Sequence, residues 1–363
     1  MKLLKLQIEN FRNHRALELD FTQADSHIFV GKNGLGKTNV IEAIHIASLA
    51  RSFRTANFEE LIQWDQDYFR TSVLIEKNHE ELPLEVFYSH RPARKKNYRL
   101  AGVSVSASNY IGHFPTVLFQ PEDLNLISLS PQVRRHYLDM LLCQTDRDYI
   151  VALANYKKIL KQRNALLKNL KARLADGGDI TAISPELAVW DRQIAESGQI
   201  IIEKRLRFIE FLNQILTELY RELSADHEQL KASYHSSIQS QYLASLSERH
   251  HVDILQGATT RGPHRDDLHF FLNDRPMTAT ASRGEFRTLL LALKLAEIEY
   301  IKSSTGQTPV LLLDDVFSEL DPERRQKLLT KIQNCQSIIT TTDLNDTESG
   351  FRNNVKICYN ISS

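Results

Sequence analysis

The sequence predicts an α/β fold built as two lobes, and three observations along its 363 residues indicate it. Apolar and polar residues alternate near the N-terminus, which is typical of antiparallel strands with one buried face. Helical apolar spacing dominates between residues 131 and 224. The C-terminal part returns to a strand–helix–strand order, which favours a parallel sheet. We therefore expect residues 1–120 plus 256–363 to form lobe I, with an N-terminal antiparallel β part, and residues 121–255 to form lobe II, a helical insertion.

The bulk composition is that of an ordinary globular protein. Apolar residues make up 42% of the chain and charged residues 25%, and the 45 Lys and Arg residues balance 45 Asp and Glu residues. A protein that binds nucleic acid needs only a local basic surface. Zero net charge therefore neither supports nor excludes DNA as a partner.

Cysteine usage and the N-terminus bear on the compartment. The three cysteines, Cys143, Cys335 and Cys358, lie far apart and form no CxxC pair, which argues against a disulfide framework or a cysteine zinc site. The N-terminus has a strand pattern instead of a signal-peptide core, and no run of about eighteen apolar residues predicts a membrane span. We expect a cytoplasmic protein, associated with the nucleoid if DNA is its partner.

Strand patterns open lobe I. Leu4, Leu6 and Ile8 alternate with polar neighbours, and a second strand at 27–30 runs into a glycine-rich loop. A helix is expected from 38 to 49, and shorter strands follow. The next run, RPARKKNYRL, is predicted to be a basic hairpin turn.

The glycine-rich loop carries the strongest local motif. Its sequence GKNGLGKT fits G-x-x-x-x-G-K-[ST] and lies between a strand and a helix, as a phosphate-binding loop requires. Its glycines let backbone N–H groups surround phosphate oxygens at a helix N-terminus. Lys37 is expected to reach the β- and γ-phosphates of ATP, and Thr38 to bind Mg²⁺. The residues expected to contact nucleotide here are Gly31, Lys32, Asn33, Gly34, Leu35, Gly36, Lys37, Thr38 and Asn39.

Lobe II is expected to contain helices near 131–143, 146–175 and 184–224, with a turn at 176–179. Between Lys157 and Arg173 there are seven Lys or Arg residues and no Asp or Glu. Such a run either contacts DNA phosphates or forms a solvated helix face. The candidate DNA contacts are Arg91, Arg94, Lys95 and Lys96 in the hairpin, and Lys157, Lys158, Lys161, Arg163, Lys168, Lys171 and Arg173 in the helix.

The C-terminal part of lobe I holds a second motif, in which a buried strand ends in Asp314 and Asp315. Asp314 is expected to hold Mg²⁺ through water, and Asp315 to polarise the water that attacks ATP. The pattern is weak by itself, because many buried strands end in Asp. It gains weight from the phosphate loop.

A third motif, SRGEFR at 282–287, precedes a helix and resembles the signature loop S-G-G-[QE] of ABC-type ATPases. In those proteins the Ser and Gly bind the γ-phosphate held by a second protomer, which gives Ser282 a catalytic role and Gly284 a nucleotide-binding one. An ordinary Ser N-cap is the alternative. The segment SELD at 318–321 resembles the D-loop that crosses an ABC dimer interface. Together the motifs predict an ABC-type P-loop ATPase head.

The loop GPHRDD at 262–267 has no assigned role from the sequence. His264 with Asp266 is a conceivable metal pair, but a hydrogen-bonded loop is the favoured interpretation.

Several blocks of the chain resemble the RecF family of bacterial gap-repair ATPases, from residue 4 to about residue 343. The blocks that carry this likeness are ENFRN at 9–13, GKNGLGKT at 31–38, SFRT at 52–55, PEDL at 121–124, GPHRDD at 262–267, LLLALKLAE at 289–297 and LLLDDVFSELD at 311–321. The family's ATPase head is similar to those of chromosome-maintenance and double-strand-break-repair ATPases, without a long coiled coil.

The resemblance implies an ATP-dependent homodimer that binds duplex DNA near single-strand gaps in DNA repair, replication and the SOS response. It implies joint work with RecR and RecO in loading the RecA recombinase. It further implies that Arg12 contacts nucleotide, and that Gln120 occupies the position of the Q-loop glutamine of related heads.

Two features qualify the likeness. The family's signature loop usually reads S-Q-G-Q-Q-R, so Arg283, Glu285 and Phe286 are departures, and Arg283 is expected to strengthen the phosphate contact. The switch position reads TTTD at 340–343 and lacks His, as in the family, which implies weak, slow ATP hydrolysis suited to a DNA-stimulated clamp.

Three other functions stay open from the sequence. The ATPase subunit of a membrane transporter would also carry a helical insertion, although it would normally have a switch His. A P-loop kinase would need neither SRGEFR nor SELD. A passive ATP-binding scaffold would not need Asp314 and Asp315 together.

Overall fold

The computed structural model describes residues 1–124, 126, 130–177, 185–224, 228–238, 241–342 and 356–360. It divides into two compact units, which we call the head unit and the helical unit. The head unit comprises Met1–Asn125, Leu216–Glu228 and Ala281–Ser363, and the helical unit comprises Leu126–Ile215 and Gln229–Thr280. The observed division thus differs from the predicted lobe boundaries, since Leu216–Glu228 also belongs to the head unit and the chain returns to it for good at Ala281 and not at residue 256.

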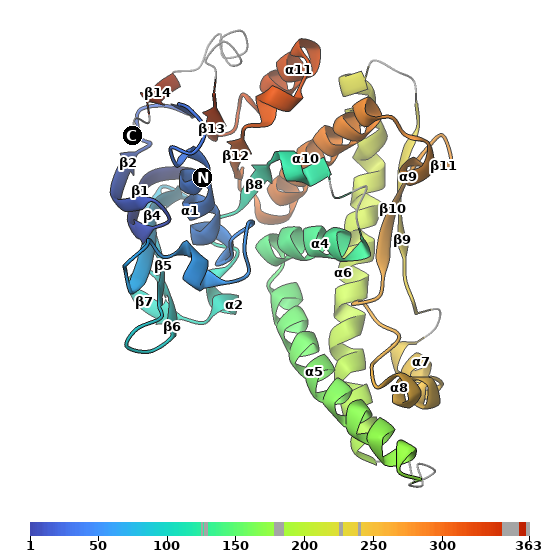
Figure 1. The fold of residues 1–363 in the computed structure, drawn as a ribbon. Coiled ribbons are helices and arrows are strands. Elements are labelled where there is room, and N and C mark those ends of the chain that lie inside the picture. Colours follow the sequence, from blue (N-terminus) through green and yellow to red (C-terminus); the bar gives the residue numbers. More distant parts are fainter. Residues whose placement is uncertain are drawn as a thin grey trace. The chain divides into compact units, whose positions relative to one another are not determined.

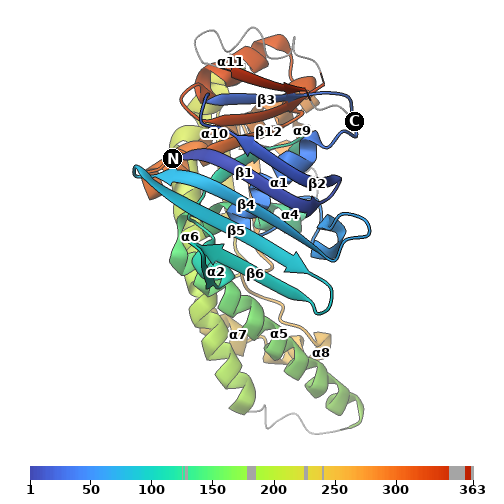
Figure 2. The same cartoon turned by 90° about the vertical axis from the view of Figure 1, so that its left-hand side faces the viewer.

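An antiparallel sheet forms the N-terminal part of the head unit, in the order β2-β1-β4-β5-β6-β7. Figure 2 shows β2, β1, β4, β5 and β6 side by side. Burial alternates along β4, which confirms the period-two pattern of a strand with one face in the core. The strands are β1 (Lys2–Phe11), β2 (His14–Asp20), β4 (Tyr68–Lys77), β5 (Glu80–Ser89), β6 (Lys95–Leu100) and β7 (Val103–Val105).

A parallel sheet forms the second part of the head unit, in the order β14-β3-β13-β12-β8. Its central strands are buried along almost their whole length, as expected when both faces are covered. Helix α1 (Lys37–Leu49) packs against strands of both sheets (Figure 1). The strands are β14 (Lys356–Asn360), β3 (Ser26–Val30), β13 (Ser337–Thr341), β12 (Val310–Asp314) and β8 (Thr116–Phe119).

The remaining elements of the head unit are helices and single turns. They are η1 (Phe58–Leu61), α2 (Ala107–Tyr110), η2 (Pro121–Leu124), α10 (Arg283–Thr305), η3 (Val316–Glu319) and α11 (Pro322–Ile332). Within the described residues, no helix combines the length and apolar character that a membrane span requires. Cys143 and Cys335 are free thiols, and the side chain of Cys358 lies outside the description.

The helical unit contains the three long helices that the sequence predicts, together with a sheet that it does not. The helices are α4 (Pro131–Thr145), α5 (Arg147–Ala175) and α6 (Pro185–Ser224), of which α6 continues into the head unit. Residues Asp176 and Gly177 form the expected turn, whereas Gly178 and Asp179 lie outside the described residues. The other elements are β9 (Leu230–His235), β10 (Asp267–Leu272), β11 (Arg275–Pro276), α7 (Tyr242–Ser247), α8 (His250–Gln256) and α9 (Met277–Thr280).

Antiparallel pairing of β10 with β9 explains the misplaced boundary. The register joins Asp267 to His235 and Leu272 to Leu230, so β10 must remain in the same unit as β9. Lobe II is therefore not purely helical, and it extends to Thr280.

Arg163 is the central buried charge of the helical unit, and this corrects its predicted role as a DNA contact. Its side chain is 0% exposed. Its Nε donates to Asp191 Oδ1 at 2.7 Å, and its Nη1 donates to Asp253 Oδ2 at 2.7 Å and to Thr259 Oγ1 at 2.8 Å. The group thus ties α5 to α6 and α8, and it cannot reach a phosphate in solvent.

The GPHRDD loop is held by hydrogen bonds, as favoured from the sequence. Tyr156 lies 2.5 Å from His264 Nδ1, and His264 Nε2 lies 3.1 Å from the Thr259 carbonyl. Asp266 is fully buried and accepts from the Tyr234 hydroxyl at 2.6 Å and the Ser237 N–H at 2.7 Å. Among the described residues, no cluster of His, Cys, Asp and Glu is suited to hold a metal ion.

We expect Arg163→Met to destabilise the protein by about 3–5 kcal/mol, because two buried carboxylates would lose their cation. Urea denaturation followed by circular dichroism measures the change. The matched control is Lys161→Met, an exposed site on the same helix, where the change should stay within about 0.5 kcal/mol. Equal stability of the two variants would refute the structural role of Arg163.

Burial lowers the pKa of His264 from 6.5 to about 4. Because the unfolded chain takes up the proton first, the contribution of neutral His264 is fully present above pH 6.5 and is lost as the pH falls towards 4. We therefore expect the unfolding free energy of the parent protein to fall more steeply over this interval than that of His264→Asn. Parallel pH profiles of the two proteins would contradict the assignment.

Candidate functional site

The loop after β3 has the backbone conformation of a phosphate-binding loop. Gly36 has φ +97°, and a Cβ at this position would lie 2.7 Å from side-chain atoms of Asn13 and His14. Gly34 also has a positive φ, +86°. Glycine is favoured at Gly36 because L side chains rarely adopt this positive φ, and the side chains of Asn13 and His14 would have to move to admit a Cβ.

Lys37 opens helix α1 and folds back over the loop. Its Nζ donates to the carbonyl oxygens of Gly31 at 2.6 Å and Lys32 at 3.0 Å. Burial lowers the pKa of Lys37, although the carboxylates of Asp315 and Asp314 oppose that shift. The ammonium group is thus held at the loop, where an incoming phosphate can replace the carbonyl oxygens as its partner.

Two hydroxyl groups converge on one carboxylate at the carboxyl edge of the parallel sheet. Thr38 donates to Asp314 Oδ1 at 2.9 Å, and Thr340 donates to the same oxygen at 2.7 Å. The pairing of β12 with β13 sets Asp314 opposite Thr340. Burial raises the pKa of Asp314, against the lowering effect of these hydrogen bonds. Asp343, the last residue of the switch position, lies outside the described residues.

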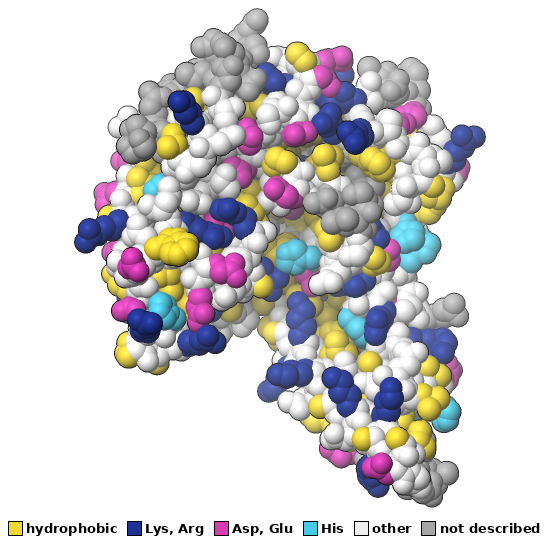
Figure 3. Space-filling model, viewed as in Figure 1, with side chains coloured by type: hydrophobic (Ala, Val, Ile, Leu, Met, Phe, Trp, Pro, Cys, Tyr) yellow, Lys and Arg dark blue, Asp and Glu magenta, His cyan; other side chains and the backbone are white. Residues whose placement is uncertain are grey.

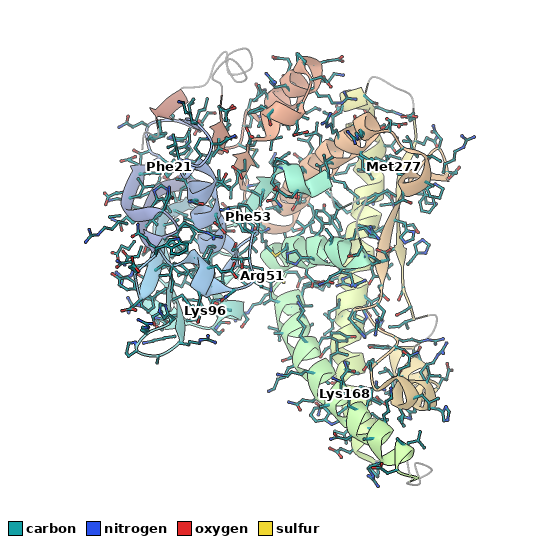
Figure 4. All side chains as sticks on the ribbon, viewed as in Figure 1. Phe21, Arg51, Phe53, Lys96, Lys168 and Met277 are labelled. Carbon is teal, nitrogen blue, oxygen red and sulfur yellow. The ribbon has the colours of Figure 1, made fainter. Side chains whose placement is uncertain are left out.

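A cavity of about 700 Å³ brings most of the predicted nucleotide contacts together. The predicted residues on its wall are Asn33, Gly34, Gly36, Lys37, Thr38, Asn39, Gln120, Asp314 and Asp315. Phe53, Arg54, Pro121 and Glu122 also line it without a role given by sequence reasoning, and so does Thr340, the first residue of the predicted switch position. Figure 4 labels Phe53, which follows α1 in the chain. Phe53 and Arg54 could have been found from the SFRT block at 52–55, which resembles the RecF family but was given no role in nucleotide binding.

The Arg12 guanidinium is engaged by a buried carboxylate and is not among the groups that line the cavity, so its nucleotide contact stays a prediction. Its Nε and Nη2 donate to Glu42 at 2.9 and 2.8 Å. Glu42 lies on α1 with a 0% exposed side chain, and it also accepts from the Ser52 hydroxyl at 2.5 Å and from Arg54 at 3.3 Å. Arg12 and Glu42 therefore orient Arg54 at the cavity wall.

The SRGEFR segment begins α10 as a capping box. Glu285 N–H donates to the Ser282 hydroxyl at 3.3 Å, and the Glu285 carboxylate accepts from Ser282 N–H at 2.5 Å. Ser282 is exposed, and no atom lies closer than 3.8 Å to a Cβ built at Gly284. Neither residue lines the cavity of its own chain. An open, ordered helix N-terminus of this kind is suited to an external anion.

Ionic contacts join α10 to two segments that lie next to cavity-lining residues in the chain. Buried Lys294 lies 3.4 Å from Asp123 of η2 and 3.3 Å from Glu297. Burial alone would lower the pKa of Lys294, but the two carboxylates raise it overall. Arg287 also pairs with Glu319 of the SELD segment at 2.6 Å. Hence α10 is joined both to η2, next to Glu122, and to the predicted D-loop.

The remaining candidate DNA contacts lie in two places: in and next to β6 of the head unit, and on α5 of the helical unit. Lys96 Nζ lies 3.1 Å from the centre of the Phe58 ring, and burial together with Arg51 lowers its pKa to about 8. Arg94 pairs with Glu59 at 2.8 Å, and Lys157 lies 3.4 Å from Asp139. Figure 3 shows Lys and Arg side chains gathered over the helical unit. The predicted DNA contacts of α5 that are exposed are Lys157, Lys158, Lys161, Lys168, Lys171 and Arg173.

Comparison with known families and proteins places this site in context. The family model described as the RecF/RecN/SMC N terminal domain matches residues 2–361. The DNA replication and repair protein RecF of Latilactobacillus sakei subsp. sakei (strain 23K) is 38% identical over 357 residues, which cover 95% of this chain and 93% of that protein. The protein of the same name from Lactococcus lactis subsp. cremoris (strain MG1363) is 40% identical over 345 residues, with 95% and 93% covered.

Solved structures agree. The recombination mediator protein RecF of the RecFOR pathway, in a form described as RecF-ATPrS, aligns with a TM-score of 0.86 at 33% identity, covering 96% of this chain and 94% of that chain. Its RecF-ATP form gives the same score and identity, with 95% and 93% covered. An Smc head bound to the C-winged helix domain of ScpA aligns at 0.52 with 14% identity over 94% of this chain and 90% of that chain, which indicates a shared fold alone.

We expect Lys37→Ala to weaken ATP binding by at least about tenfold, since a charge-assisted bond to phosphate contributes about 1.5–3 kcal/mol. Isothermal titration calorimetry measures the change. Lys2→Ala is the matched control, because it removes the same charge from an exposed side chain of the head unit that does not line the cavity. ATP affinity equal to that of the parent protein in Lys37→Ala would disprove the phosphate-loop assignment.

Proposed function

The chain belongs to the RecF family of DNA replication and repair ATPases, and from that premise we propose an ATP-dependent DNA-binding clamp. ATP binding joins two copies of the chain, the dimer binds duplex DNA next to a single-strand gap, and the complex assists the loading of a recombinase. Slow hydrolysis then releases the DNA. Partners of the RecR and RecO type follow from the RecFOR pathway named for the related structure.

The observation that carries this proposal is the division of the nucleotide machinery over two surfaces of the head unit. The cavity presents the phosphate loop, Asp314 and Asp315, while Ser282 and Gly284 lie on none of its walls. A second copy that places its α10 N-terminus at the cavity supplies the missing anion contacts. Dimerisation then depends on the γ-phosphate, because ADP leaves the α10 terminus without a ligand.

The Thr38 and Asp314 side chains fit a magnesium ion that accompanies ATP. Both offer oxygen, the ligand that Mg²⁺ prefers, and they are 2.9 Å apart. Phosphate oxygens and water would complete the coordination shell, because Mg²⁺ usually keeps several waters and binds through one or two carboxylates plus substrate phosphates. When bound, the ion neutralises phosphate charge that develops during transfer.

Asp315 is our proposed orienting group for the attacking water. It has a left-handed backbone with φ 51° and its N–H donates to the Thr340 carbonyl at 3.2 Å, so its position is tied to the end of β13. Lys37 holds the β- and γ-phosphates, and Ser282 of the second copy contacts the γ-phosphate. Hydrolysis removes that phosphate and with it the contact that joins the two copies.

Sequence-independent phosphate contacts account for the proposed DNA binding. The exposed cations of α5 are the first candidates, since Lys158 and Lys161 are exposed on its surface. In the β5–β6 hairpin, Lys95 is exposed, while Arg94 and Lys96 are partly engaged by Glu59 and the Phe58 ring.

Molecular mass in solution tests the clamp directly. We would measure it by light scattering with Mg²⁺ and either no nucleotide, ADP or a non-hydrolysable ATP analogue, each with and without a gapped duplex. A mass that doubles only with the analogue, and a shift onto DNA in that state, is the expected result. A monomer in every condition that ignores DNA would refute the clamp and favour a P-loop kinase.

We expect Ser282→Arg to bind ATP as the parent does and to lose at least about tenfold in ATP-driven dimer affinity, because a bulky side chain would occupy the anion site. Ser304→Arg, exposed near the other end of α10, is the matched control and should dimerise normally. Analytical ultracentrifugation measures the dimer affinity, and calorimetry measures the ATP affinity. Normal dimers of Ser282→Arg would show that this segment is an ordinary helix cap.

A further inference from the structure

The helical unit contains a hollow of its own, beside the GPHRDD loop. Its volume is about 360 Å³, and its wall is formed by Ser237, Arg249, Val252, Gln256, Thr260, Arg261 and Arg265. Three of these residues carry guanidinium groups, none carries a carboxylate, and Val252 is the one aliphatic member. The hollow is therefore a polar, positively charged site.

Arg261 and Thr260 of this wall are placed by ordered neighbours. Arg261 Nη1 donates to the buried Ser245 hydroxyl at 2.9 Å, and the Arg261 carbonyl accepts from Tyr242 at 3.0 Å. Thr260, also on the wall, donates through its N–H and hydroxyl to Asp253 at 3.0 and 2.6 Å. The wall thus has a fixed geometry before any ligand binds, which reduces the entropy cost of binding.

The acidic groups next to the hollow are engaged elsewhere. Asp253 is fully buried against Arg163, and Asp266 is fully buried against Tyr234 and Ser237. Glu248 is exposed and lies 3.9 Å from Arg261. This exposed ion pair offsets at most one of the three guanidinium groups, so among the described residues the hollow keeps an excess of positive charge.

Helix α5 extends the positive surface. A Cβ built at Gly257, which follows Gln256 of the wall, would lie 3.2 Å from Lys171 Cδ and 3.6 Å from Lys168 Cγ. The two lysine stems therefore lie across Gly257, and both residues are exposed. Figure 4 labels Lys168 on α5. The cations of the hollow and of α5 consequently form one neighbouring set.

We propose that this hollow binds backbone phosphates of nucleic acid, an inference that rests on the proposed DNA-binding function. Guanidinium groups bind phosphate oxygens in a bidentate manner, and Ser and Thr hydroxyls add neutral donors. The lining lacks the apolar pockets that recognition of a peptide side chain requires. The GPHRDD loop accordingly serves as the rigid support of Arg261 and Arg265.

Fluorescence anisotropy with a labelled gapped duplex, over a salt series and with a non-hydrolysable ATP analogue, tests the proposal. The variant combines Arg249→Gln, Arg261→Gln and Arg265→Gln. A second variant, Arg249→Gln with Arg265→Gln, keeps the Arg261–Ser245 bond in case the triple change impairs folding. The matched control removes three exposed cations of the same unit, through Arg192→Gln, Arg207→Gln and Lys231→Gln. Thermal unfolding verifies that each variant is folded.

The triple variant should lose at least about tenfold in affinity, and the slope of log K against log salt should fall by about 0.9 for each lost contact. Lysine at the same three positions should restore most of the slope. If the parent binds DNA and the triple variant has the same salt slope as the control variant, the proposal is overturned. If the three substitutions weaken the binding of a polyglutamate peptide but leave DNA binding unchanged, the hollow binds an acidic protein instead. A parent protein that binds no duplex in any nucleotide state would refute the proposed function itself.

Discussion

The hydrogen bond between Thr38 and Asp314 is the contact on which the site depends. It joins groups 276 residues apart in sequence, at 2.9 Å. The parallel registers of β3 with β13 and of β13 with β12 make this distance possible, since the carboxyl ends of all three strands meet at one edge. β8 adds Gln120 and η2 to the same edge by pairing with β12. A shift of one residue in any of these registers would turn a required side chain into the core.

Buried charges then fix the orientation of the surrounding elements. Glu42 holds Arg12 and Arg54 beside α1, Lys294 joins η2 to α10, and Arg163 joins three helices of the helical unit. Each buried charge carries a large desolvation cost, so such pairs contribute less to stability than to a unique geometry. In the head unit these pairs fix η2 against α10 and Arg54 beside α1.

The sequence predicted what depends on local spacing and missed what depends on distant partners. The phosphate loop, the strand before Asp314 and the long helices follow from patterns within a few residues. The contacts of Glu42 could not be predicted, because nothing in the local sequence shows that Arg12 and Arg54 bind the same carboxylate. Arg163 was mistaken for a surface cation, although it lies seven residues after buried Tyr156 and four before buried Leu167, on the apolar face of α5. The β9–β10 pairing was missed because β9 is short and follows a long helix.

The two interpretations of Ser282, helix cap and signature serine, are compatible in the structure. The capping box uses the N–H groups of Ser282 and Glu285, and the Phe286 N–H donates to the Ser282 carbonyl at 3.0 Å. The N–H groups of Arg283 and Gly284 belong to the first turn, which has no intrahelical acceptor for them. The Ser282 hydroxyl accepts from Glu285 but keeps its own proton to donate. The cap thus orders the first turn and leaves two amides and a hydroxyl directed at an anion, and the absence of a side chain at Gly284 lets that anion approach the backbone.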